Sequence, residues 1–290
     1  MGTAADFHSE GDRLGCPAPG WSITETCANL WAMRPTRREI TWPAVIVLLA
    51  LPLWSSRTPA QTADEVVARY LTALGGRDRA EQVHSLRLIG TISFGPGAEG
   101  VDTVELERPM KLRTTIVMQG RTLVQAYDGH TAWTIDPFSG PPVPRVMPPA
   151  QARNVAAGAD MDGPLIDYVA KGNQVTLSGM DTLNGRPEYR IAVTTADGLH
   201  DTYYIDARTF LKSHWEGQRE MNGKPVVFES YFGDYRRVNG VMFPFRIDSD
   251  TKGNPGGQHL QFTSIETNVP VPDARFQMPD SSATSKDTAS

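Results

Sequence analysis

The first half of the chain contains several stretches in which apolar and polar side chains alternate. The clearest is 110–118, where apolar or small residues occupy every second position: Leu112, Thr114, Ile116 and Met118. A period of two is typical of an antiparallel strand with one buried face. Similar stretches predict neighbouring strands in an antiparallel meander at 86–94, 101–108, 121–127 and 131–136.

A second series of strands is predicted from residue 173 onward. These strands are expected at 173–179, 187–195, 201–206, 210–219, 225–232, 241–248 and 258–267. Hairpin turns are indicated by dipeptides that adopt the positive φ of a type I′ turn at little cost. These dipeptides are Asp128-Gly129, Asn184-Gly185, Asn222-Gly223 and Asn239-Gly240.

Helices are predicted at the start of the domain and in its middle. Thr62-Ala63-Asp64-Glu65 has the form of a capping box, and apolar residues then recur at helical spacing until Gly75-Gly76. A short second turn is expected over 79–84. Beyond a loop rich in proline and glycine at 137–149, helices are expected at 150–159 and 165–170.

The first sixty residues are expected to lie outside the folded domain. From Met33, a basic stretch is followed by an apolar run from Trp42 to Trp54 and by a small residue at Ala60, the order found in a signal peptide. The run is shorter than the roughly 20 residues that span a bilayer. We therefore expect a misassigned extension at 1–32, a cleaved signal peptide at 33–60, one domain at 61–279 and a disordered tail at 280–290. Retention of the apolar run as a membrane anchor is the alternative.

Composition narrows the possible functions. Both cysteines, Cys16 and Cys27, lie in the expected extension, so the domain would contain no thiol for catalysis, redox chemistry or lipid attachment. The net charge is −5 and no basic run stands out. These features argue against nucleic acid as a partner and against steady binding to anionic membranes.

Motifs for catalysis or cofactor binding are not apparent. Residues 95–100 match G-x-G-x-x-G, but a strand rather than a helix is expected to follow, so a hairpin loop is the better interpretation. The histidines show no spacing that favours a metal site. Asp197, Asp201 and Asp206 resemble turn and strand-edge residues more than a catalytic pair. We therefore expect no enzyme activity, no cofactor and no metal.

The apolar faces of the strands allow two interpretations. Leu112, Ile116 and Met118 share one face, and the strands near 228 and 243 carry several phenylalanines. These residues either form the core of a sheet packed on its own helices, or line an apolar cavity that the short helices cannot fill. The pattern alone does not decide between the two.

Three segments resemble a known family. They are Leu106-Glu107-Arg108-Pro109-Met110-Lys111-Leu112-Arg113, the hairpin Tyr127-Asp128-Gly129-His130-Thr131-Ala132-Trp133, and Asp273-Ala274-Arg275-Phe276-Gln277-Met278-Pro279. They are similar to the Arg-Pro, the D-G-x-x-x-W hairpin and the D-x-x-F-x-x-P ending of the outer-membrane lipoprotein-sorting carriers (LolA-like and RseB-type proteins). The chain resembles a divergent subgroup of that family.

The resemblance implies a mainly β (α+β) fold. Its strongly curved antiparallel sheet forms an open, incomplete β-barrel, with short helices as a plug or lid over an apolar cavity. Arg108 would hold the lid closed over the empty cavity, because a guanidinium can bind several carbonyls at a helix end. The expected cavity residues are Leu112, Ile116, Met118, Trp133, Phe228, Phe232, Phe243 and Phe245.

The resemblance also implies a function and its partners. A periplasmic carrier would bind acyl chains of lipoproteins or other lipids, exchange them with transfer proteins of the inner and outer membranes, and act as a monomer. The long proline-rich loop, Gly163-Pro164 and the segment 231–244 depart from the best-known carriers, so lipoprotein is not established as the cargo. Two rival functions are a sensor module that binds a protein partner, and an enzyme working inside the cavity.

Overall fold

The computed structural model describes residues 61–221 and 224–280. The expected extension 1–32 and signal peptide 33–60 lie outside the described residues. So do the Asn222-Gly223 turn and the tail, apart from Asp280.

The first helix, α1 (Ala63–Leu74), forms as predicted from its capping box. The Glu65 amide donates to the Thr62 hydroxyl, and the Thr62 amide donates to the Glu65 carboxylate, at 3.2 and 3.1 Å. Gly75, at φ +123°, ends the helix. The short helix α2 (Arg77–Glu81) follows, two residues earlier than the predicted 79–84.

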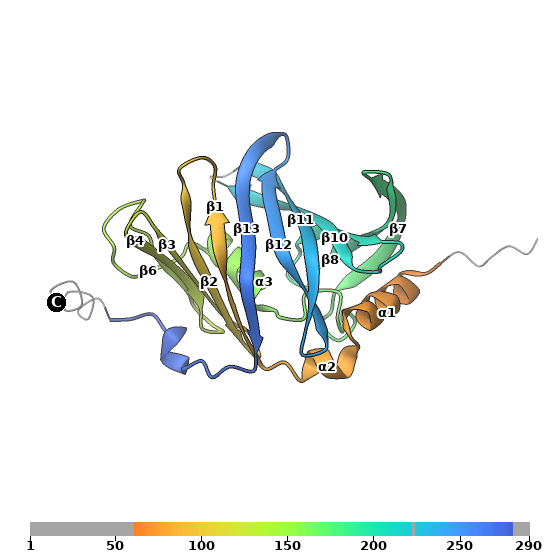
Figure 1. Ribbon diagram of the computed structural model, residues 1–290, viewed down its shortest axis with the longest axis horizontal. Helices are drawn as coiled ribbons and strands as arrows, with labels where there is room; N and C mark the ends of the chain where they lie inside the picture. The colour runs from red at the N-terminus through yellow and green to blue at the C-terminus, as the bar shows by residue number, and fades with distance from the viewer. Residues whose placement is uncertain (1–60, 222–223, 281–290) are drawn as a thin grey trace, which may run out of the picture. The chain divides into compact units, whose positions relative to one another are not determined.

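All strands of the described part belong to one antiparallel sheet (Figure 1). Its order is β6-β5-β4-β3-β2-β1-β13-β12-β11-β10-β9-β8-β7, and the edge strands β6 and β7 do not pair with each other. The predicted open, incomplete barrel is therefore confirmed. The strands are β1 (Ser85–Ser93), β2 (Glu99–Glu107), β3 (Lys111–Met118), β4 (Arg121–Tyr127), β5 (Ala132–Ile135), β6 (Arg145–Val146), β7 (Gln174–Leu183), β8 (Arg186–Thr194), β9 (His200–Asp206), β10 (Lys212–Met221), β11 (Lys224–Val238), β12 (Val241–Thr251) and β13 (Asn254–Thr267).

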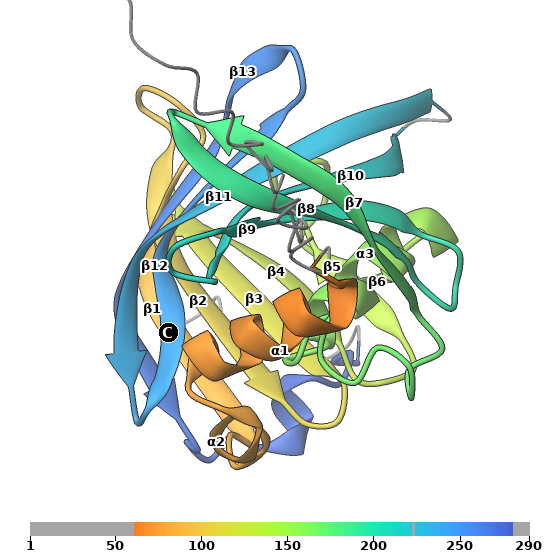
Figure 2. The ribbon, with the colours of Figure 1, turned by 90° about the vertical axis from the view of Figure 1, so that its right-hand side faces the viewer.

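The connection between the two edge strands lies on the inner side of the curved sheet (Figure 2). It consists of α3 (Pro149–Ala159), which contacts β3, β4 and β5, and of residues 160–172, which we call the lid segment. The helix predicted at 165–170 is wrong, because this stretch consists of turns. Gly163 and Asp167, at φ +65° and +54°, adopt left-handed conformations that a right-handed helix does not accommodate.

Of the three predicted hairpin turns that the structure describes, two form as expected. Asn184-Gly185 and Asn239-Gly240 have positive φ at both residues and join adjacent strand ends, as a type I′ turn requires. The turn at Asp128-Gly129 is instead a four-residue loop in which Gly129 alone of the two residues has positive φ. The Asp128 carboxylate stabilises this loop by accepting hydrogen bonds from the amides of His130 and Thr131.

The inner face of the sheet carries two apolar clusters. The first joins β1, β2, β3, β12 and β13 through buried residues that include Leu106, Ile116 and Leu260. The second joins α1 to β8 and β9, with Val66 and Ile191 fully buried. α1 packs against the second cluster but contributes no residue to the first. This helix therefore covers only part of the inner face.

The outer face is covered at one end by the C-terminal segment, which includes the short 3₁₀ helix η1 (Asp273–Arg275). The indole of Trp133 donates to the carbonyl of Phe276 at 2.7 Å, and both residues are fully buried. The guanidinium of Arg275 binds the buried carboxylate of Glu105 at 2.5 Å. The Asp-x-x-Phe motif thus fixes the end of the chain to the sheet.

A single carboxylate interrupts the first inner cluster. Asp102 is 1% exposed and lies opposite Ile116 on β3 and Gly90 on β1. Neither of its oxygens has a well-formed hydrogen bond. Burial raises the pKa of Asp102 from 3.8 to about 6, which the Thr103 amide offsets only in part.

This raised pKa predicts how a substitution will change stability. Because the native state binds the proton more tightly than the unfolded state, Asp102 costs stability as pH rises from about 4 to about 6. The full cost above that range is up to about 3 kcal/mol. Asp102→Asn is therefore expected to raise the free energy of unfolding by about 1–3 kcal/mol at pH 8, and most of the gain should be gone at pH 4. Urea denaturation at both pH values measures this difference.

The matched control is Asp181→Asn, which changes an exposed carboxylate on β7. It should alter stability by less than about 0.5 kcal/mol at either pH. An equal effect of Asp102→Asn at the two pH values would show that the charge of Asp102 is not the cause.

Candidate functional site

A cavity of about 1460 Å³ lies between the inner face of the sheet, α3 and the lid segment. Its volume exceeds the roughly 300–1,000 Å³ of ordinary small-molecule sites. One wall comes from β9, β10 and β11, and the facing wall includes Ala156, Ala157 and Gly158 of α3. The small side chains of this helix leave room that larger ones would fill.

The sheet wall carries three large aromatic side chains. Tyr203, Trp215 and Phe228 come from three consecutive strands, and pairing places Tyr203 opposite Trp215. Phe94, from the β1–β2 hairpin, and Leu199 add further apolar surface. This part of the cavity suits a hydrocarbon chain.

A buried ion pair lies on the same wall. Arg219 donates to both carboxylate oxygens of Asp201, at 2.7 and 3.1 Å, and the two side chains are 10% and 5% exposed. Gly217 makes room for the pair, because a Cβ there would lie 2.5 Å from Asp201 Oδ1 and 2.3 Å from the Trp215 ring. The buried Nε1 of Trp215 has no hydrogen-bond partner. The cavity therefore offers polar groups as well as apolar surface.

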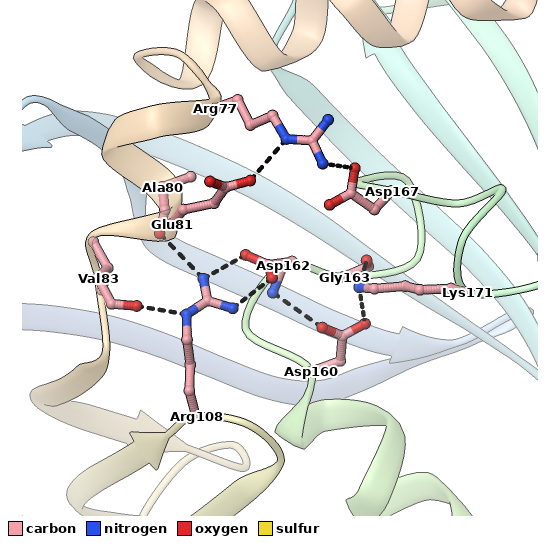
Figure 3. A network of polar contacts seen from close by, with 10 residues as sticks. All are labelled: Arg77, Ala80, Glu81, Val83, Arg108, Asp160, Asp162, Gly163, Asp167 and Lys171. Atoms are coloured by element: carbon pink, nitrogen blue, oxygen red, sulfur yellow. Dashed lines mark hydrogen bonds and ion pairs between the residues drawn. The ribbon is translucent and has the colours of Figure 1, made fainter.

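Arg108 connects the sheet, α2 and the lid segment (Figure 3). Its guanidinium donates to both oxygens of Asp162, at 2.5 and 2.6 Å, and to the carbonyls of Val83 and Ala80, at 2.7 and 3.1 Å. Its contact with the lid segment is therefore a carboxylate, whereas the sequence resemblance implied backbone carbonyls. A bidentate pair of this kind is stronger and more specific in geometry than a single hydrogen bond.

Other charged groups constrain the lid segment. Lys171 pairs with Asp160 and donates to the Gly163 carbonyl at 2.8 Å, and both contacts lie within the segment (Figure 3). Arg77, the first residue of α2, pairs with Asp167. A second ion pair thus joins the segment to α2.

The ion pair with Arg108 sets the pH range in which the lid is fastened. Its hydrogen bonds hold the pKa of Asp162 below the usual range. A carboxyl with a depressed native pKa stabilises the fold above its unfolded pKa and loses that effect as pH falls through the native value. The contact between Arg108 and Asp162 is therefore intact at neutral pH and weakens below about pH 4.

The eight predicted cavity residues lie in different places. Phe228 lines the large cavity, whereas Ile116 and Phe245 are buried in the first inner cluster. Leu112 and Met118 pack against that cluster, and Leu112 lies beneath Gly158 of α3.

Trp133 is placed on the other side of the sheet from the cavity. It pairs with Ala126 in the register that turns both side chains to the outer face, where the C-terminal segment covers them. The expectation that Trp133 lines the cavity is corrected accordingly. Phe232 and Phe243 lie near a second, smaller chamber rather than the large cavity.

Several residues of the site were not identified from the sequence. Asp201 was interpreted as a strand-edge residue, and nothing in the spacing indicated that Arg219 would reach it from the next strand. The alternation of β9 and β10 could have placed both side chains on the inner face, but the strand pairing that brings them together depends on the fold.

Among the described residues, no His, Cys, Asp and Glu side chains gather in a group of three or more that could hold a metal ion. No helix among them is long and apolar enough to cross a bilayer.

Comparison with known proteins gives matches among solved structures. No family model and no curated protein sequence matches the chain. The fold is similar to a DUF1329 family protein from Desulfovibrio piger, with a TM-score of 0.51 and 11% identity over 74% of this chain and 97% of that one. It is also similar to a LolA superfamily protein from Nitrosomonas europaea (TM-score 0.48, 14% identity, 75% and 98% of the two chains). A third match is a domain described as an outer-membrane lipoprotein-sorting protein from Vibrio parahaemolyticus (0.49, 8%, 73% and 95%).

The likeness to the Desulfovibrio protein shows a shared fold and, at this identity, the fold alone.

The contacts of Arg108 predict how the lid segment will move when they are removed. Arg108→Leu leaves Asp162 without its guanidinium, so the free energy that opposes opening of residues 160–172 should fall by about 2 kcal/mol. Amide hydrogen exchange in that segment should then become roughly 30-fold faster. Exchange measured by mass spectrometry, peptide by peptide, tests this.

Arg275→Leu is the matched control, because it also removes an arginine from a carboxylate but acts on the outer face. It should speed exchange near β2 and leave residues 160–172 unchanged. Unchanged exchange of the lid segment in Arg108→Leu would exclude a fastening role for Arg108.

Proposed function

We propose that this protein is a non-enzymatic periplasmic carrier that holds the acyl chain of a lipid or lipoprotein in the large cavity. The observation that carries the proposal is the cavity of about 1460 Å³ beneath a lid segment that a bidentate ion pair fastens. The sequence resemblance to the lipoprotein-sorting carriers supports the same conclusion.

The energetics favour such a ligand. Burial of hydrocarbon yields about 0.8 kcal/mol per methylene, so a chain of sixteen carbons offers roughly 12 kcal/mol before the costs of binding. Opening the contact between Arg108 and Asp162 costs only about 2 kcal/mol. A long acyl chain can therefore displace the lid and still bind.

The polar groups on the sheet wall of the large cavity favour a ligand that is not purely hydrocarbon. Trp215 Nε1 is a buried donor without a partner, on the same wall as the neutral pair of Arg219 and Asp201. An ester or amide carbonyl would satisfy the indole without adding a charge. Acyl esters and acyl amides of lipids carry such groups beside their chains.

Lipid extraction is the first experiment. The protein, purified without detergent, is analysed by native mass spectrometry and its extract by lipid mass spectrometry, and the delipidated protein is titrated with a pyrene-labelled fatty acid. Co-purified acyl chains and saturable probe uptake support the carrier. A protein that is empty and cannot take up the probe would contradict it, and co-purification of a protein partner instead would favour the sensor.

Narrowing the cavity should reduce uptake. Ala156 of α3 lines the cavity, so Ala156→Phe fills part of the space that the chain would occupy. Loss of room for a few methylenes should weaken probe binding by at least about tenfold. Gln151→Phe, on the exposed side of the same helix, is the control and should bind the probe like the wild type. Equal binding by both variants would place the probe elsewhere.

Releasing the lid should strengthen ligand retention. The bonds of Arg108 stabilise the closed, empty state, and their removal therefore shifts the equilibrium toward the loaded state. Arg108→Leu is expected to hold the probe up to roughly 30-fold more tightly at equilibrium. The partition of the probe between the protein and lipid vesicles measures this affinity. The same partition as in the wild type would show that Arg108 does not oppose loading.

A further inference from the structure

A second, smaller chamber lies behind the ion pair of Arg108 and Asp162. It has a volume of about 150 Å³, and both of these residues line it as well as the large cavity. α1 contributes Tyr70, β10 contributes Lys212, and the β11–β12 hairpin contributes Tyr235 and Phe243. The two spaces are therefore separated by the contact that fastens the lid.

Lys212 is a half-buried cation without an acidic partner in this chamber. Its Nζ lies 3.8 Å from the centre of the Phe232 ring and 5.8 Å from that of Tyr203. None of the ion pairs in the described part of the chain includes Lys212. Burial alone lowers the pKa of Lys212 to about 8. Aromatic faces stabilise an ammonium group, but they do not neutralise it.

Tyrosine hydroxyls surround the same space. The hydroxyl of Tyr235 donates to the backbone carbonyl of Lys212 at 2.8 Å, which keeps its ring beside the lysine. Tyr70 is only 9% exposed, and its hydroxyl makes no hydrogen bond to another described residue. The pKa of Tyr70 is raised to about 12 by burial, so this hydroxyl keeps its proton and can donate it.

The charge of the chamber is unbalanced. The titratable and charged groups that line it are Arg108, Asp162, Lys212, Tyr70 and Tyr235. Arg108 and Asp162 neutralise each other, and the tyrosines are neutral, which leaves one positive charge on Lys212. An uncompensated charge in such surroundings is costly, and an anion at this place would remove the cost.

We infer that the small chamber binds the anionic head, a carboxylate or phosphate, of an amphiphile whose chain occupies the large cavity. Lys212 and the Tyr70 hydroxyl donate to this head. The space exceeds the volume of such a group, since each water in the liquid takes about 30 Å³. The shared lining residues provide the continuity, because a chain that displaces Asp162 from Arg108 joins the two spaces. This inference rests on the proposed function and specifies its ligand class.

The test compares ligands with the same chain and different heads. A neutral pyrene-labelled alkane is first bound to the full-length protein at about pH 7. Its displacement is then measured with dodecanoate, dodecyl phosphate and dodecan-1-ol. Inorganic phosphate is tested alone. The wild type should prefer the two anions over the alcohol by at least about tenfold, the usual effect of a charge-assisted hydrogen bond. The preference should fall at about pH 9.5, where Lys212 loses its proton.

Substitutions assign the effect to Lys212. Lys212→Met should abolish the preference for anions and leave the affinity for the alcohol within about threefold of the wild type. Lys212→Arg should keep the preference for anions. Lys252→Met, which removes an exposed lysine paired with Glu216 and Glu229, is the control and should keep it too.

Four outcomes would overturn the inference. Equal binding of anions and alcohol by the wild type would reject the anionic head but leave the carrier function intact. Failure of all three ligands to bind would reject both. A preference that survives in Lys212→Met would place the head elsewhere. Stabilisation by inorganic phosphate through Lys212, without any preference among the three amphiphiles, would identify a site for a free anion.

Discussion

The pairing of β1 with β13 determines the architecture of this protein. It joins the first strand to the last, so that the meander before the lid and the meander after it become one sheet. The pairing is close, because a Cβ on Gly90 would lie 2.3 Å from the carbonyl oxygen of Gln261. As a result, β6 and β7 become the two edges, and the chain between them must lie against the inner face. A twisted sheet of this width encloses more space than α1 and α3 fill, and the cavity is the consequence.

The lid segment differs from the rest of the fold in how it is held. Arg108 and Arg77 bind two of its carboxylates from outside, Lys171 pairs with Asp160 within it, and Leu165 and Ile166 are its buried apolar side chains. The ion pairs can be lost and re-formed at lower cost than the contacts of a packed core. Because a binding site that must open is built from such parts, the position of the lid over the cavity is consistent with a carrier.

The sequence was sufficient to predict most of the sheet. Alternation identified most strands to within a few residues, and the capping box at Thr62 identified α1, since both signals depend on neighbouring residues alone. The exceptions are β11, which continues six residues beyond its predicted end, and β6, which lies in the predicted loop 137–149. The sequence prediction failed at 165–170, where apolar composition suggested a helix but Gly163 and Asp167 adopt left-handed backbone conformations. It also failed at Asp128-Gly129, where the Asp128 side chain stabilises a four-residue loop instead of the predicted type I′ turn. In each case a local contact outweighed the average propensity.

The cavity itself was less predictable. Alternation correctly gathered Leu112, Ile116 and Met118 on one face, but whether that face is core or cavity depends on where α3 lies, which no local pattern specifies. Trp133 was assigned to the cavity but lies on the outer face. The C-terminal segment that buries it is 143 residues away in the sequence, so no local pattern could indicate this position. The pairs of Arg108 with Asp162 and of Arg219 with Asp201 are likewise separated by 54 and 18 residues.

Three of the cations that line these spaces, Arg108, Arg219 and Lys212, differ in a way that bears on function. Arg108 and Arg219 each bind a carboxylate through two hydrogen bonds, as the planar guanidinium favours, and they are thereby neutralised. Lys212 has only aromatic faces, although a carboxylate at a neighbouring position would have stabilised the fold. Asp102 is also buried without a partner, but it is enclosed by the first inner cluster and lines neither space. Lys212 differs from Asp102 because its charge borders an open chamber. A ligand can bind to a charge that has no partner in the folded protein and that borders an open chamber. The proposed selectivity for the ligand head therefore lies behind the lid rather than in the large cavity.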